Sequence, residues 1–290
     1  MNLSMEKTII AAPDGAQITL CRQECLAGMR QNLGDASVDL VVTSPPYNIG
    51  VSYGSYYDRR PRGEYLDWIE EVGREIKRVL KENGSFFLNV GGKPSDPWIP
   101  LDIIQRLRQH FTLQNVIHWI KSIALSRGDR SDHSAPADLA FGHYKPIPGR
   151  RFLNDCQEYL FHLTKTGRVQ IERLAVGVPY QDKSNIGRWK AATKDKRCRG
   201  NTWFIPYETI KSREKQRPHP STFPVKLPEM CIRLQGLGRT GVVLDPFMGL
   251  GSTALAALNL GVSCIGFEID PQYFEVSVAR LQEAARAQPL

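Results

Sequence analysis

The sequence predicts an α/β fold with a doubly wound, mostly parallel sheet and an inserted basic lobe. Short apolar runs alternate along the chain with segments in which apolar residues recur at helical spacing. This alternation is typical of βαβ units, which place helices on both faces of a parallel sheet. One region, 165–217, follows neither period and carries a strong positive charge. We therefore expect it to be an insertion between elements of the sheet.

Six apolar runs have the length of buried strands, and two segments have the pattern of crossover helices. The strands are expected at 38–43, 84–90, 115–120, 158–163, 242–245 and 264–268. A helix is expected at 64–80, where apolar residues recur every three or four positions before Asn83 and Gly84 end the run. A second helix is expected at 252–260, which is rich in Ala and Leu and stops at Gly261. The stretches 49–63 and 124–151 are rich in Gly, Ser, Pro, Tyr and charge, which favours loops.

The composition is that of an ordinary globular protein. With 290 residues, of which 41% are hydrophobic and 23% charged, the chain can bury a large core. The N-terminus lacks the basic and apolar regions of a signal peptide, and no window reaches about 18 apolar residues, so we expect a cytoplasmic protein without membrane contact. The six cysteines, at 21, 25, 156, 198, 231 and 264, show no Cys-x-x-Cys spacing and no accompanying His cluster. They predict reduced thiols and no metal site.

The net charge of +8 is concentrated in one region. Within 165–217, fourteen Lys and Arg face five Asp and Glu, an excess of nine, so the rest of the chain sums to minus one. The aromatic residues of this region are interleaved with the basic ones and include Tyr180, Trp189, Trp203, Phe204 and Tyr207. Such a mixture suits a polyanion with stackable bases. A solvated surface lobe stays open as the alternative on composition alone.

The stretch 244–253, Leu-Asp-Pro-Phe-Met-Gly-Leu-Gly-Ser-Thr, has the pattern of a cofactor cradle. A strand ends at Asp245, and the glycines at 249 and 251 allow a tight turn close to a ligand. A helix then begins where Ser252 or Thr253 can act as its cap. The strand, turn and helix together predict a binding site at the helix N-terminus.

An acidic residue strengthens this prediction. Glu268 closes the next expected strand seventeen residues after Gly251, where it can accept hydrogen bonds from both hydroxyls of a ribose. The pair of features indicates a cofactor that contains adenosine. Ala254 stands where a dinucleotide fingerprint has its third glycine, which weighs weakly against NAD because alanine is sometimes allowed there.

The stretch 41–47, Val-Val-Thr-Ser-Pro-Pro-Tyr, follows a strand directly and has the pattern of a site for a planar amine. Pro45 and Pro46 restrict the backbone after Ser44, so the Ser44 hydroxyl and the Pro45 carbonyl can face one point. These two acceptors could bind both N–H groups of an exocyclic amine while Tyr47 stacks on the ring. A rigid Pro-Pro turn without a chemical role is the alternative.

The segments 43–47 and 245–251 resemble the catalytic and cofactor motifs of the exocyclic amino DNA methyltransferases. In that family Asp, Asn or Ser precedes Pro-Pro and an aromatic residue. The catalytic motif here precedes the cofactor motif by about two hundred residues, which resembles the β class, and the resemblance covers most of 18–280. It implies a Rossmann-like methyltransferase sheet with a catalytic half at 1–164, a target-recognition region at 165–217 and a cofactor-binding half at 218–290.

The resemblance also implies S-adenosyl-L-methionine as cofactor, and it assigns roles to individual residues. Catalysis falls to Ser44, Pro45, Pro46 and Tyr47. Cofactor binding falls to Thr43, Asp245, Phe247, Gly249, Gly251, Ser252, Thr253 and Glu268. The segment 219–228 resembles the part that closes the cofactor pocket and adds His219, Thr222 and Phe223, although a locally bonded helix start is the alternative for His219. Glu24 stands where many relatives carry Asp near the adenine, and it is expected to substitute at longer reach.

The expected partner is double-stranded DNA. Its phosphates are expected to contact the basic residues Arg188, Lys190, Lys194, Lys196, Arg197 and Arg199. Because the target amine lies inside a duplex stack, the base must be rotated out into the pocket. A cognate restriction endonuclease is a further candidate partner, and a monomer or a homodimer is expected.

The expected reaction is direct in-line transfer of a methyl group to the amine nitrogen, with catalysis by positioning and electrostatics. Methylation of a ring carbon would need the Pro-Cys motif, which does not occur in this sequence. The resemblance favours cytosine N4 over adenine N6, because relatives acting on adenine usually carry Asp at position 44 and because 219–228 is more similar to the cytosine-N4 enzymes. Methylation of RNA or of a protein amide, and a DNA-binding module without catalysis, remain as alternatives.

Overall fold

The computed structural model describes residues 6–12, 15–126, 128, 138–142, 149–188, 190, 194–206 and 221–287. Its elements in chain order are β1 (Glu6–Ala11), β2 (Gln17–Arg22), α1 (Cys25–Asn32), β3 (Val38–Thr43), α2 (Arg62–Val79), β4 (Leu80–Val90), α3 (Ile99–Leu107), β5 (Thr112–Ile120), β6 (Ile123–Leu125), β7 (Leu139–Phe141), β8 (Gln157–Thr164), η2 (Lys183–Asn185), β9 (Thr202–Phe204), α5 (Lys226–Gln235), η3 (Leu237–Arg239), β10 (Val242–Asp245), α6 (Ser252–Asn259), β11 (Ser263–Glu268) and α7 (Pro271–Ala287). Among the helices in these ranges, none is long and apolar enough to cross a lipid bilayer.

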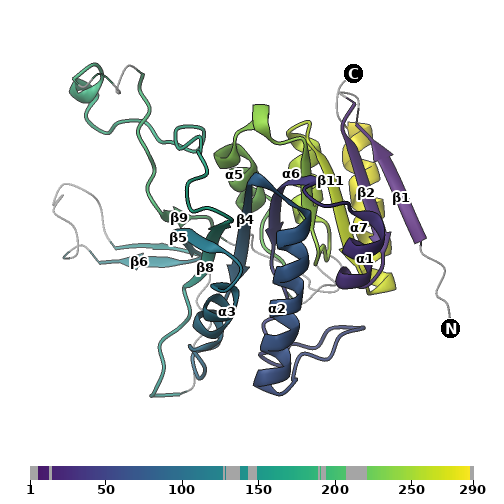
Figure 1. Ribbon diagram of the computed structural model, residues 1–290. Helices are drawn as coiled ribbons and strands as arrows, with labels where there is room; N and C mark the ends of the chain where they lie inside the picture. The colour runs from purple at the N-terminus through teal and green to yellow at the C-terminus, as the bar shows by residue number, and fades with distance from the viewer. Residues whose placement is uncertain are drawn as a thin grey trace.

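A nine-stranded sheet forms the centre of the molecule, with the order β1-β2-β11-β10-β3-β4-β8-β5-β9 (Figure 1). The strands from β2 to β4 in this order run parallel to one another, and β9 runs parallel to β5. Only β1 and β8 are antiparallel to their neighbours among the paired strands of this sheet. The predicted α/β fold with a mostly parallel sheet is confirmed.

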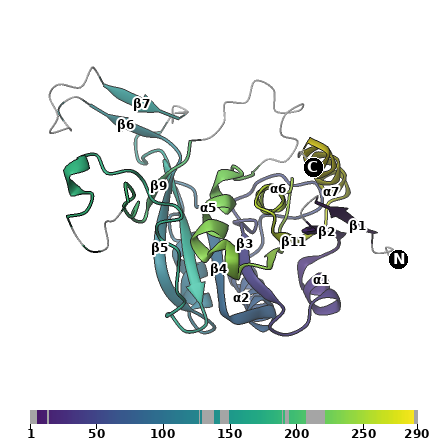
Figure 2. The same ribbon diagram turned by 90° about the horizontal axis from the view of Figure 1, so that it is seen from above.

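Helices cover both faces of the sheet, as the prediction of a doubly wound fold requires. The helices α1 and α2 pack on one face, and α5, α6 and α7 pack on the other (Figure 2). The helix α3 shares the core of α1 and α2. Successive side chains of β3 point to opposite faces, so Leu40 joins the core under α5 to α7 while Val41 joins the core under α1 to α3. In β4, Phe87 and Phe86 divide in the same way. Strands buried on both faces read as continuous apolar runs, which is why the sequence revealed them.

The strand order reverses between β3 and β10, and this reversal positions the site. From β3 the chain passes through α2 to β4 on one side, and from β10 it passes through α6 to β11 on the other. At such a switch point the two connections leave in opposite directions and open a crevice beyond the carboxyl ends of the strands. Thr43 ends β3 and Asp245 ends β10. The motifs at 43–47 and 245–251 therefore meet at the same crevice.

Several elements differ from the prediction. The hairpin β1-β2 and the helices α1, α3 and α7 were not predicted, and β4 begins at Leu80 because its first residue pairs with Val38. The stretch 124–151, expected as a loop, contributes residues to β6 and the whole of β7, which pair antiparallel. β9 lies inside 165–217 yet pairs with β5. Strands of three residues are too short to show a period, so sequence pattern could not identify them.

Candidate active site

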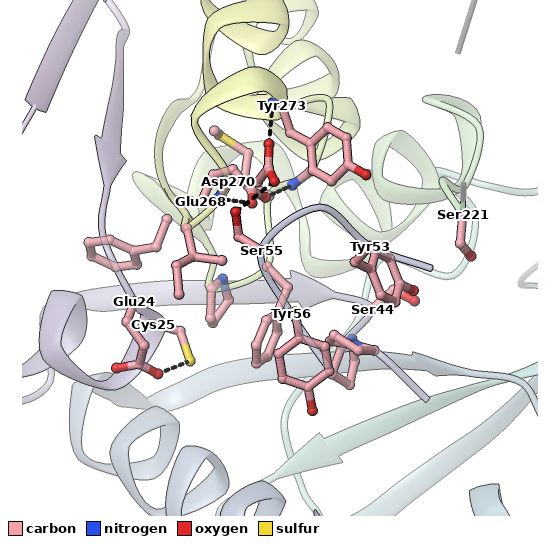
Figure 3. Close-up of a pocket in the computed structure, with 18 of the residues that line it drawn as sticks. Glu24, Cys25, Ser44, Tyr53, Ser55, Tyr56, Ser221, Glu268, Asp270 and Tyr273 are labelled. Carbon is pink, nitrogen blue, oxygen red and sulfur yellow. Dashed lines mark hydrogen bonds between the residues drawn. The ribbon is translucent and has the colours of Figure 1, made fainter. Parts of the chain in front are cut away.

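A cavity of about 230 Å³ opens at the strand switch point (Figure 3). Its walls come from the start of α1, the turn after β3, the loop before α2, the turn after β10 and the start of α7. The predicted site residues that line it are Glu24, Ser44, Pro45, Pro46, Thr222, Phe223, Phe247, Gly249, Ser252 and Glu268. His219 lies outside the described residues. The structure thus brings the two motifs and the acidic strand end to one cavity.

A backbone N–H of the turn after β10 forms a hydrogen bond with the Glu268 carboxylate. Gly249 and Gly251 have φ angles of 53° and 75°, a region that favours glycine because it has no side chain. The N–H of Gly249 donates to Oε2 of Glu268 at 2.8 Å, and the N–H of Asp270 donates to Oε1 at 2.8 Å. Burial raises the pKa of Glu268 to about 7, although these hydrogen bonds oppose the rise. Each carboxylate oxygen keeps a second lone pair that a ligand hydroxyl can use.

Four residues expected at the cofactor are buried and do not line the cavity, namely Thr43, Asp245, Gly251 and Thr253. The Oδ1 atom of Asp245 accepts hydrogen bonds from Thr43 Oγ1 at 2.5 Å and from the Phe247 N–H at 3.1 Å. The hydroxyl of Thr253 donates to the Val42 carbonyl at 3.3 Å. Burial raises the pKa of Asp245 to about 6. In this structure the bond between Thr43 and Asp245 joins the ends of β3 and β10, and Thr253 links α6 to β3.

Ser44 lies on the cavity wall, whereas Tyr47 does not. Tyr47 is 8% exposed, and its hydroxyl lies 2.7 Å from Ser44 Oγ and donates to Glu158 Oε2 at 3.0 Å. The hydroxyl of Tyr65 donates to the Pro46 carbonyl at 2.7 Å, which restrains the turn. The sequence predicted that Tyr47 would stack on a bound ring. The Tyr47 hydroxyl is bonded to Glu158 of β8, and other residues supply the aromatic faces that line the cavity. Stacking of Tyr47 on a base stays a prediction.

Tyr56, Trp68 and Phe247 form an aromatic wall, of which the sequence predicted only Phe247. The rings of Tyr56 and Trp68 stack with centroids 5.6 Å apart, and Trp68 meets Phe247 edge-on at 5.5 Å. The guanidinium carbon of Arg60 lies 5.0 Å from the Tyr56 centroid and 5.3 Å from that of Trp68. Burial raises the pKa of Tyr56 to about 12, and its hydroxyl is buried without a hydrogen-bond partner in the described part of the chain. Trp68 lies on α2, where its spacing resembles that of a core residue.

The loop at 48–60 is held together by one buried carboxylate. Asp58 is 2% exposed and accepts hydrogen bonds from the backbone N–H groups of residues 48–51 at distances of 2.7 to 3.2 Å. At the tip of the loop, Ser55 Oγ donates to Asp270 Oδ2 at 2.8 Å (Figure 3). Asp270 also accepts hydrogen bonds from backbone N–H groups at the start of α7. The loop is therefore tied to both sides of the cavity.

Glu24 combines a structural role with its place on the wall. Its Oε2 atom accepts the Ala27 N–H at 2.9 Å and caps α1, and the Cys25 thiol donates to Oε1 at 3.1 Å (Figure 3). Asp270 and Tyr273 also line the cavity but were not predicted. Their position within five residues of Glu268 was the signal that could have identified them.

The predicted DNA-contacting residues lie apart from the cavity, in the excursion between β8 and β9 that extends away from the sheet (Figure 1). Five of the six are exposed, namely Arg188, Lys190, Lys194, Lys196 and Arg197. Arg199 is half-buried, and its Nε donates to the Val176 carbonyl at 2.9 Å. Of the aromatic residues expected among them, Trp189 and Tyr207 lie outside the described residues. Within the described ranges, no group of three His, Cys, Asp or Glu side chains is arranged to hold a metal ion.

Replacing Asp58 by Ala should loosen the loop at 48–60, because the N–H groups of residues 48, 49 and 51 lose their acceptor while that of Gly50 keeps the Asp58 backbone carbonyl. A buried donor left without a partner costs about 1–3 kcal/mol, so we expect faster hydrogen exchange at residues 48–51 and faster proteolysis within the loop. Asp35→Ala is the matched control, because Asp35 is largely exposed and forms a surface ion pair with Arg78. Equal exchange rates in both variants would contradict the assigned role of Asp58.

Comparison with known proteins agrees with this geometry. A family model described as DNA methylase, for N6 and N4 methyltransferases, matches residues 38–279. Type II methyltransferase M.BglII from Bacillus subtilis is 31% identical over 264 residues, which cover 86% of this chain and 65% of that protein. The chain therefore spans slightly less than two thirds of the length of this relative.

Solved structures share the fold. The PvuII DNA methyltransferase, which is cytosine-N4-specific, superposes with a TM-score of 0.62 at 18% identity over 96% of this chain and 95% of that chain. TTHA0409 from Thermus thermophilus, a putative DNA modification methylase solved with S-adenosyl-L-methionine, superposes with a TM-score of 0.57 at 25% identity over 91% and 93%. The family match extends over most of the sequence and includes both motifs of the cavity. The chain belongs to the N6/N4 family of DNA methylases, the exocyclic amino methyltransferases.

Proposed function

We propose that this chain is a site-specific DNA methyltransferase that moves a methyl group from S-adenosyl-L-methionine to the exocyclic amine of a base rotated out of the duplex. The observation that carries the proposal is the shared cavity of Ser44 and Glu268. Ser44 follows β3 and Glu268 ends β11, so an amine acceptor and a ribose acceptor come from opposite sides of the strand switch. One cavity can then hold the methyl donor and the amine together.

The residues of the cavity fit S-adenosyl-L-methionine. The fixed carboxylate of Glu268 suits two ribose hydroxyls, and the aromatic faces of Tyr56, Trp68 and Phe247 suit a positively charged sulfonium. The buried Tyr56 hydroxyl, which has no partner in the described part of the chain, offers one more polar contact. When bound, the cofactor supplies a methyl group on a cationic sulfur.

The chemistry of the cavity favours an amine over a ring carbon. A ring-carbon methyltransferase needs a thiolate to attack the base. Cys25 lines the cavity, but burial and the neighbouring Glu24 raise the pKa of its thiol well above the ordinary value, which keeps it protonated. Ser44 instead offers an oxygen that can accept an N–H from an amine.

Cytosine N4 is the favoured target atom, and adenine N6 is the alternative. The choice depends on Ser44, because relatives that act on adenine usually carry Asp at this position. Duplex DNA incubated with the protein and labelled cofactor should yield N4-methylcytosine after digestion to nucleosides and mass spectrometry. Label in N6-methyladenine alone would reverse the choice of base, and label in 5-methylcytosine would contradict the reaction type. Label transferred only to RNA or protein would contradict the assignment of DNA as the substrate.

Cofactor affinity should depend on the ionisation of Glu268. Its pKa of about 7 means that the carboxyl is largely protonated at lower pH and offers fewer acceptors to a ribose. We expect affinity to increase by up to about tenfold per pH unit below 7 and to level off above it. Calorimetric titration with S-adenosyl-L-methionine tests this, with Glu268→Gln as the control that binds weakly at every pH. A flat profile in the unaltered protein would count against a ribose contact.

The same pKa shift affects stability in the opposite sense. A carboxyl whose pKa rises from 4.5 in the unfolded chain to about 7 in the folded protein binds more protons when folded. Stability without cofactor should therefore fall as pH increases through this window. A ligand that binds the ionised Glu268 carboxylate would stabilise the folded protein and offset this loss of folding stability at higher pH.

We also propose that the region 165–217 recognises the DNA target and grips its phosphates. Replacing Lys194, Lys196 and Arg197 by Gln should weaken DNA binding and lower the slope of log K against log salt by about 0.9 for each lost phosphate contact. Arg199 is left unchanged because its side chain bonds to the Val176 carbonyl. Arg74→Gln, at an exposed position on α2, is the control. An unchanged slope in the triple variant would mean that these residues do not contact phosphates and that the region is a solvated surface.

A further inference from the structure

A chain of hydrogen bonds runs from the cavity wall into the sheet. Ser44 Oγ lies 2.7 Å from Tyr47 Oη, which lies 3.0 Å from Glu158 Oε2. The amide nitrogen of Asn89 lies 2.8 Å from Tyr47 Oη and 2.7 Å from Glu158 Oε2. On the far side, Lys121 Nζ lies 3.0 Å from Glu158 Oε1. The chain therefore ends in a carboxylate with a cationic partner.

The antiparallel strand β8 brings Glu158 to this place. Because β8 runs against β4 and β5, its first residues lie beside the last residues of those strands. Glu158 pairs with Trp119 of β5, and Lys121 follows Trp119 by two residues. The start of β8 thus lies at the same end of the strands as the turn that follows β3. A strand parallel to β4 would have its first residues at the other end.

The chain has a direction because each hydroxyl carries one proton. An ionised carboxylate only accepts, so Tyr47 donates to Glu158. The Asn89 amide nitrogen only donates, so it cannot take a proton from Tyr47. Tyr47 has then used its proton, and Ser44 must donate to it. The Asn89 amide nitrogen also lies 3.5 Å from Ser44 Oγ, so one lone pair of that oxygen can take this long contact. The other lone pair is available toward the cavity, where an amine N–H needs an acceptor.

We propose that Glu158 is a positioning residue that orients this chain and receives, through it, the proton that the amine loses; this inference rests on the proposed function. As the nitrogen–methyl bond forms and the sulfur–methyl bond breaks, the nitrogen becomes positively charged. Its N–H proton passes to Ser44 Oγ, the Ser44 proton to Tyr47 Oη, and the Tyr47 proton to Glu158 Oε2. The neutral Glu158 later returns its proton to water. No oxidant or further reactant takes part.

A second buried polar cluster lies on the same strands but away from the cavity. His162 Nε2 lies 2.9 Å from Ser85 Oγ, and His162 Nδ1 lies 2.9 Å from the Asn115 amide nitrogen. These three residues also join β4, β8 and β5, and His162 and Ser85 are fully buried. None of them lines the cavity. They supply a matched control for the effects of strand packing.

The test is a double-mutant cycle on the rate of methyl transfer in a single turnover, with cofactor and DNA saturating. Glu158→Gln keeps the shape but allows an amide N–H to point at Tyr47 and reverse the chain. Glu158→Gln and Tyr47→Phe should each slow transfer by at least about tenfold, the loss expected for a hydrogen bond to a charged acceptor. The double variant should be no slower than the slower single variant within about twofold, because both changes break one chain. Ser85→Ala should leave the rate unchanged within about twofold.

Thermal unfolding and calorimetric cofactor binding confirm that each variant is folded and loaded. An unchanged rate in Glu158→Gln, independent effects in the double variant, or an equal loss in Ser85→Ala would each overturn the role of Glu158 while leaving the enzyme's activity established. Absence of methyl transfer to any DNA by the unaltered protein would overturn the proposed function, and the inference with it.

Discussion

Thr43 and Asp245 are 202 positions apart in the chain, yet they share a buried hydrogen bond of 2.5 Å where the strand order of the sheet reverses. This bond joins the carboxyl ends of β3 and β10. The same Asp245 oxygen accepts the N–H of Phe247 and so restrains the first residues of the glycine turn. Because Ser44 follows Thr43 directly, its position relative to the turn depends on this contact. An unpaired carboxyl at this depth would be costly, and the hydrogen bonds offset that cost.

The loop at 48–60 connects the two halves of the site that the strand switch separates. Its base follows the turn after β3 and is held by Asp58, while its tip is bonded to Asp270 at the start of α7. The loop also carries Tyr56, which stacks on Trp68 of α2. One loop therefore links the turn after β3 with the start of α7 across the cavity. A loop that covers a cavity excludes water from it and strengthens electrostatic contacts inside.

Three buried acids follow a consistent arrangement around the cavity. Asp245, Glu158 and Asp58 are all buried carboxylates, and each binds backbone or side-chain donors next to a cavity segment. None of the three lines the cavity itself. Segments that form the cavity wall are thus held by buried acids behind them. Fixed donors and acceptors need no reorganisation during a reaction, which is the main source of electrostatic catalysis.

The sequence by itself determined the parallel strands, the glycine turn, and the places of Ser44 and Glu268 on the cavity wall. These features depend on short-range chemistry: apolar runs, residues that permit a tight turn, and polar residues at strand ends. Only the tertiary structure decided that Thr43 and Asp245 bond to each other behind the wall, that Tyr47 faces Glu158, and that Trp68 of α2 faces the cavity. The reason is the separation of the partners along the chain, which is 202 residues for the first pair and 111 for the second. Local pattern places a residue on a strand or a helix, but the packing of distant elements selects which neighbour its side chain meets.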